Sequence, residues 1–112
     1  MGESTLYEAE RLLRKYIEER YKGFFVEVSE HTCRGGVTYK MMYINKGVRS
    51  NRRLCAVIIV GSDGFAGALD ESHSAILPEC VHRECRFEPA SFPYWLDEVF
   101  QREGVKEMLI AA

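Results

Sequence analysis

Residues 54–60 have the sequence Leu-Cys-Ala-Val-Ile-Ile-Val, without one polar side chain, so a folded chain must cover this run from both sides. Its length and its β-branched residues are typical of a strand. The run is far shorter than the roughly 20 apolar residues that a membrane-spanning helix needs. We therefore predict that it is the central strand of a sheet with material on both faces.

Residues 5–22 have the pattern of an amphipathic helix. Apolar side chains recur at helical spacing, and charged residues fill the other face; the apolar positions are Leu6, Ala9, Leu13, Tyr16 and Ile17. Thr5 and Glu8 match a capping box, in which each side chain accepts a hydrogen bond from a free backbone N–H group. Gly23 stands where a helix commonly ends in a left-handed residue.

After Gly23 the apolar pattern changes to the alternation of a β-strand, with Phe24, Val26 and Val28 on one face. The glycines of residues 33–36 predict a hairpin turn, because glycine tolerates the positive φ that such turns require. The next predicted strand has an apolar face of Val37, Tyr39, Met41 and Tyr43, and an opposite face of Thr38, Lys40 and Met42. Residues 45–51 are predicted to form a basic loop.

The second half of the chain predicts two further strands and a helix. Residues 61–64 indicate a turn, 65–69 a fourth strand, 70–78 an irregular loop and 81–87 a fifth strand. A second helix is expected to begin near Ser91, with Pro93 in its first turn, where the missing N–H group costs nothing. Residues 105–112 are expected to form a further turn or a short helix.

This order of elements predicts a single α+β domain over residues 1–112. We expect an N-terminal helix, an antiparallel sheet of about four to five strands and a C-terminal helix. Both helices would cover one face of the sheet, giving a two-layer sandwich.

Charge is distributed unevenly along the chain, although the net charge is only −2. Residues 32–62 contain no acidic side chain and six basic ones, which are Arg34, Lys40, Lys46, Arg49, Arg52 and Arg53. Such asymmetry indicates a positive surface that can attract an acidic partner.

We therefore predict a small non-catalytic binding domain, such as an inhibitor, an adaptor or an immunity-type protein, that docks onto an acidic protein surface through these six residues. An alternative is nucleic-acid binding by the same face, because lysine and arginine neutralise phosphates and aromatic side chains such as Tyr39 and Tyr43 can stack on bases. No sequence motif specifies a catalytic residue. Residues 70–74 hold acid, hydroxyl and imidazole groups side by side, but catalytic triads are assembled in space rather than from adjacent residues.

The four cysteines are interpreted as reduced thiols of a cytoplasmic protein, because residues 1–4 lack the features of a signal peptide. We expect no cofactor and no metal. The alternative is a zinc or thiol site made by His31, Cys33, Cys80 and His82, if the first and fifth strands are neighbours. In the other interpretation, Cys33 and Cys80 are loop thiols, and Cys55 and Cys85 are core residues.

The last residues, from Met108 to Ala112, are unusually apolar for a terminus. They either pack on the core or lie against a partner. Together with a fifth strand at the edge of the sheet, they are consistent with a homodimer formed through the C-terminus.

Overall fold

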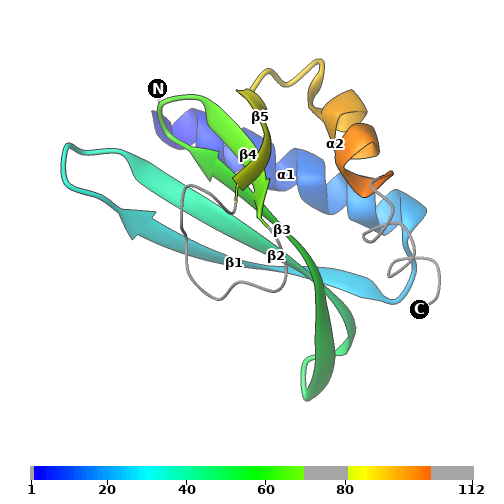
Figure 1. Ribbon diagram of the computed structural model, residues 1–112. Coiled ribbons are helices and arrows are strands. Elements are labelled where there is room, and N and C mark those ends of the chain that lie inside the picture. Colours follow the sequence, from blue (N-terminus) through cyan, green and yellow to red (C-terminus); the bar gives the residue numbers. More distant parts are fainter. Residues whose placement is uncertain (1, 70–80, 102–112) are drawn as a thin grey trace.

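A five-stranded antiparallel sheet forms the centre of the fold, and each strand pairs with the strand before it in the sequence. The computed structural model describes residues 2–69 and 81–101. Its elements are α1 (Gly2–Arg20), β1 (Phe24–Thr32), β2 (Thr38–Val48), β3 (Asn51–Gly61), β4 (Phe65–Leu69), β5 (Val81–Arg86) and α2 (Phe92–Phe100). The predicted α+β fold is thus confirmed (Figure 1).

The central strand is β3, as the apolar run predicts. All its residues from Cys55 to Gly61 are buried. Ile58 and Val60 pack into the core beneath α1, whereas Val57 and Ile59 belong to a second apolar cluster with Met41 and Leu69. The sheet therefore has one face covered by α1, here called the α1 face, and a second face with its own apolar cluster.

The apolar stripe of α1 lies on the sheet as predicted, but the helix begins earlier than expected. Its first residue is Gly2, so Thr5 lies within the helix and the predicted capping box does not mark the helix start. The helix ends at Arg20, and Gly23 has the positive φ of 85° expected for a left-handed residue at this bend.

The predicted grouping of side chains on the two faces of β2 is confirmed, but the face with Lys40 and Met42 is the one that meets α1. Met42 and Ile44 are fully buried under α1, together with Lys40, whereas Tyr39, Met41 and Tyr43 lie on the second face. Both faces of β2 are covered, so alternation alone cannot tell which one meets the helix.

The predicted basic loop at residues 45–51 is instead a tight hairpin. β2 continues to Val48, β3 begins at Asn51, and only Arg49 and Ser50 form the turn. A β-bulge interrupts the β2–β3 pairing: Ile44 pairs with Ala56, but the next residue, Asn45, pairs with Leu54. β3 thus has one extra residue here, and the register between the bulge and the turn is shifted by one.

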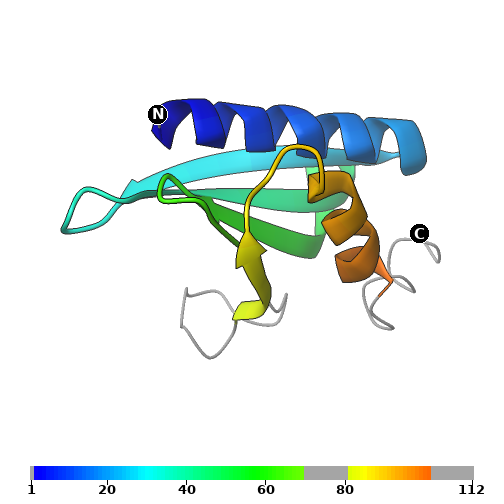
Figure 2. The ribbon, with the colours of Figure 1, turned by 90° about the horizontal axis from the view of Figure 1, so that it is seen from above.

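The second helix begins after Ser91 and has Pro93 in its first turn, as predicted. It packs against the C-terminal half of α1 (Figure 2), where the Tyr16 hydroxyl donates a 2.6 Å hydrogen bond to Asp97. The rings of Tyr16 and Phe100 lie 5.5 Å apart. The buried side chains of α2 belong to the same core as α1, as expected for helices that share one face of the sheet.

Several predictions fall outside the described residues. These are the irregular loop at 70–78, Cys80, the segment at 105–112 and the C-terminal dimer contact. Within the described part of the chain, no helix combines the length and apolar character that a membrane span requires.

The hairpin depends on Gly47, which allows a prediction. Gly47 has a φ of 105°, and a Cβ atom there would lie 2.5 Å from the carbonyl oxygen of Asn51. We expect Gly47→Ala to lower the free energy of unfolding by about 2–3 kcal/mol, since positive-φ strain and a backbone clash add. Urea unfolding followed by circular dichroism measures the loss.

Gly36→Ala is the matched control. Gly36 also has a positive φ, of 87°, but its Cβ atom would meet nothing within 4 Å. This variant should lose only about 1 kcal/mol, the strain alone. Equal losses in both variants would show that the contact with Asn51 is unimportant.

Candidate functional site

The six basic residues of the acid-free segment do not form one surface. Arg34 lies in the turn between β1 and β2, and Arg49 lies in the turn between β2 and β3. An 11-residue strand separates these turns, which is about 33 Å at the rise of an antiparallel strand. Figure 1 shows the two turns at opposite ends of the sheet. Arg34 is therefore exposed but far from the others.

Lys40 is not a surface residue either, in contrast to the prediction. Its relative exposure is 6%, and its Nζ atom lies 2.7 Å from Glu10 on α1 and 3.3 Å from Glu30 on β1. A lysine can be buried only when its charge is paired, and these two carboxylates pair it. The hydrogen bond from Lys40 is the main cause that lowers the pKa of Glu10 below its ordinary value.

The remaining four basic residues, Lys46, Arg49, Arg52 and Arg53, lie together on the β2–β3 hairpin and are called the basic tip. β1 begins opposite Lys46, and β4 pairs only with Val57–Val60 of β3. Residues 47–53 therefore form a two-stranded ribbon with no strand on either side, and the ribbon extends away from both helices (Figure 1).

The bulge decides which charges meet on this ribbon. Between the bulge and the turn, Lys46 pairs directly with Arg53 on β3 and with Phe24 on β1. Phe24 packs into the α1-side core, so this row of residues lies on the α1 face. Arg52 faces the other way, next to Leu54 on the second face. Like charges directly opposite each other in a ladder are destabilising.

Only one carboxylate neutralises the basic tip within the described residues. Arg52 Nε lies 3.0 Å from Glu27 Oε1, and Arg52 also donates a 2.8 Å hydrogen bond to the carbonyl oxygen of Arg49. No described carboxylate forms an ion pair with Lys46, Arg49 or Arg53. The tip therefore has an excess of positive charge.

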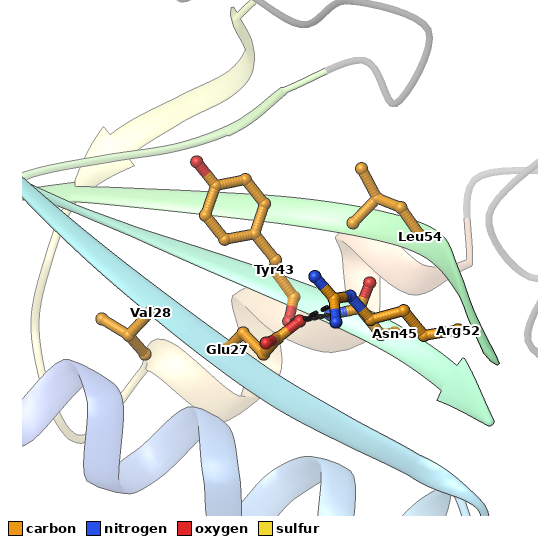
Figure 3. Close-up of a pocket in the computed structure, with 6 residues that line it drawn as sticks. All are labelled: Glu27, Val28, Tyr43, Asn45, Arg52 and Leu54. Carbon is orange, nitrogen blue, oxygen red and sulfur yellow. Dashed lines mark hydrogen bonds and ion pairs between the residues drawn. The ribbon is translucent and has the colours of Figure 1, made fainter. Parts of the chain in front are cut away.

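A hollow of about 410 Å³ opens beside Arg52 on the second face (Figure 3). We call it the hairpin hollow; it is lined by Glu27, Val28, Tyr43, Asn45, Arg52 and Leu54. Asn45 is almost fully buried, and its amide donates a 3.0 Å hydrogen bond to the same Glu27 oxygen that binds Arg52. The Tyr43 hydroxyl lies 3.3 Å from Ser29 Oγ.

The sheet order separates the candidate zinc ligands. β1, which carries His31 and leads to Cys33, and β5, which carries His82, are the two opposite edges of the five-stranded sheet and not neighbours. Adjacent strands are about 4.8 Å apart, which puts β1 and β5 roughly 19 Å from each other. Among the residues placed by the structure, no group of three or more His, Cys, Asp or Glu side chains could hold a metal ion.

Sequence reasoning missed several residues of this site. Lys22 adjoins the base of the hairpin, because the carbonyl oxygen of Gly23 accepts a 3.0 Å hydrogen bond from Gly47 N. Its charge was hidden in the acidic N-terminal third of the chain. Glu27 and Asn45 meet through the β1–β2 pairing, whereas Leu54 joins them only through the bulged β2–β3 register, and no local pattern indicates that.

The pairing of Lys40 predicts a cost for removing its partner. We expect Glu10→Gln to lower the free energy of unfolding by about 1–2 kcal/mol at neutral pH, since a charge-assisted hydrogen bond to a buried ammonium is lost. Because folding lowers the pKa of Glu10, its stabilisation is complete above the ordinary carboxyl pKa of about 4.3 and is lost as pH falls through the lower folded value. The difference between wild type and variant in urea unfolding should shrink in acid.

Glu8→Gln is the matched control. Glu8 lies on the same helix and pairs with Arg11, but 31% of its side chain is exposed and that of Arg11 is 49% exposed. We expect a loss below about 0.5 kcal/mol. If Glu8→Gln costs as much as Glu10→Gln, burial of Lys40 does not determine the effect.

No known protein family, curated protein or solved structure matches this chain. The geometry of the basic tip and the hairpin hollow is accordingly the basis for a functional proposal.

Proposed function

We propose that this protein is a non-catalytic binding domain that docks onto an acidic surface of a partner protein through the basic tip. The tip supplies four cations on a projecting ribbon, and among the described residues only one carboxylate balances them. Glu27 forms an ion pair with Arg52 and accepts a hydrogen bond from Asn45, which supports a positioning role for Glu27 rather than acid–base chemistry.

The observation that carries this proposal is the pair of Lys46 and Arg53. The two residues stand directly opposite each other, and no carboxylate of the described chain balances them. Such a pair costs stability, and an acidic partner would turn that cost into binding free energy.

The composition of the tip favours a protein partner over nucleic acid. Val48 is 64% exposed between the charges, and arginines interleaved with apolar residues are common in protein interfaces. Single-stranded bases stack on aromatic rings, but the exposed aromatic side chains of the described chain, Tyr7 and Tyr94, lie on the helices. The docking surface is thus smaller than predicted from sequence, since Arg34 and Lys40 are elsewhere.

The proposal places the protein in the cytoplasm. Cys33 and Cys85 are free thiols, and Cys33 is exposed, which suits a reducing compartment.

Charge reversal at the tip tests the proposal. We expect the double variant Arg49→Glu/Arg53→Glu to weaken binding of a fluorescein-labelled polyglutamate peptide about 10- to 100-fold at low salt, because two attractions become repulsions. Fluorescence anisotropy measures the affinity. Labelled single- and double-stranded oligonucleotides are titrated in parallel, and tighter binding to either one would favour a nucleic-acid partner instead.

Arg34→Glu is the matched control for position. It reverses another exposed arginine, at the opposite end of the sheet, and should change the affinity less than about twofold. Failure of the wild-type protein to bind polyglutamate, or equal loss in Arg34→Glu, would refute docking through the tip.

The pairing of Lys46 with Arg53 predicts that charge reversal at Arg53 raises stability although it weakens binding. Arg53→Glu places a carboxylate opposite Lys46, and we expect it to raise the free energy of unfolding by about 0.2–1 kcal/mol. Urea unfolding of the single variant gives the value. A loss of stability would mean that the two cations do not repel each other in the folded protein.

A further inference from the structure

We propose that the hairpin hollow holds an apolar side chain of the acidic partner segment, while Arg52 binds the carboxylate next to that side chain. This inference rests on the proposed function, since it identifies the feature that the partner must present besides its charge. Arg52 belongs both to the basic tip and to the wall of the hollow, so one segment could contact both (Figure 3).

Two of the lining side chains give the hollow an apolar wall. Leu54 and the ring of Tyr43 line it from β3 and β2, and both are only half-buried. The side chain of Val28, at the β1 edge of the hollow, packs against the α1-side core instead. In Figure 3, the side chains of Tyr43 and Leu54 stand up from the sheet on either side of the space. A volume of about 410 Å³ is enough for one aromatic or large aliphatic side chain.

The polar groups of the hollow satisfy one another, so that an apolar occupant breaks no hydrogen bond. Glu27 Oε1 accepts a 3.0 Å hydrogen bond from Asn45 Nδ2 and forms a 3.0 Å ion pair with Arg52 Nε. Asn45 Nδ2 also lies 3.4 Å from the carbonyl oxygen of Tyr43. An apolar group can bind next to buried donors and acceptors that already have partners, because no polar group then loses a hydrogen bond to water.

Arg52 is fixed in place before the partner arrives. Its Nε atom binds Glu27 and its Nη1 atom binds the carbonyl oxygen of Arg49, yet 47% of its side chain remains exposed. A guanidinium carries five N–H donors, so further donors are free for a carboxylate. Holding the side chain in advance reduces the entropy lost on binding.

The surrounding charge selects the occupant. Lys46, Arg49 and Arg53 lie on the same ribbon and repel a cationic ligand, whereas they attract a carboxylate at the rim. An apolar anchor in a pocket next to an arginine is also the usual composition of an interface hot spot. The occupant is therefore an apolar residue adjacent to an acidic one.

Two fluorescein-labelled heptapeptides test the inference with the full chain. Both carry three acidic residues, and they differ only in having Phe or Ser before the first acidic residue. We expect the Phe peptide to bind about tenfold more tightly in fluorescence anisotropy, since its ring becomes buried in the hollow. Equal binding of both peptides overturns this inference alone, whereas binding of neither overturns the proposed function as well.

Variants of the hollow locate the contact. Leu54→Ser removes one wall, and Leu54→Trp fills the space; each should abolish the preference for Phe while leaving the affinity for the Ser peptide within about twofold. If Leu54→Ser does not fold, Leu54→Trp alone decides. Val48→Ser is the control, because Val48 is the exposed apolar residue of the tip. Loss of the preference in Val48→Ser but not in the Leu54 variants would overturn the inference.

Discussion

The pairing of β2 with β3 is the interaction on which both the core and the candidate site depend. These are the two longest strands of the sheet. Their side chains Ile44, Ile58 and Val60 pack into the core under α1, and Met41 and Ile59 belong to the cluster on the second face. Both strands extend beyond Phe24, the first residue of β1, so the end of β2 and the start of β3 leave the body of the domain as a ribbon. The long ladder that stabilises the core thus also supports the basic tip.

The sequence contains enough information to predict most of the elements. The helical period of residues 5–22, the apolar run 54–60 and the Ser91–Pro93 start each correspond to a real element. The errors have a common cause, which is that tertiary contacts outweigh local signals. Thr5 is not a cap because the helix extends to Gly2, and residues 45–51 are not a loop because β3 offers them a partner.

The site was harder to predict than the fold, because it depends on register. One bulge places Lys46 opposite Arg53 and brings Leu54 and Arg52 to the face that carries Glu27. Without it, Leu54 would pair with Lys46 and face α1. Charge composition correctly indicated an unbalanced positive segment, but it could not separate the tip from Lys40, since the partner of Lys40 lies 30 residues away on α1.

The same acid-free segment therefore has two physical outcomes. Lys40 is surrounded by the sheet and α1, where an unpaired ammonium would be too costly, and two carboxylates meet it there. The tip is exposed to water, which solvates unpaired cations, and Glu27 is the one carboxylate of residues 2–69 and 81–101 that pairs with it. Glu27 orients Arg52 without cancelling the charge of Lys46, Arg49 and Arg53. A carboxylate in this position gives the ribbon a fixed guanidinium and leaves the remaining positive charge for a partner to neutralise.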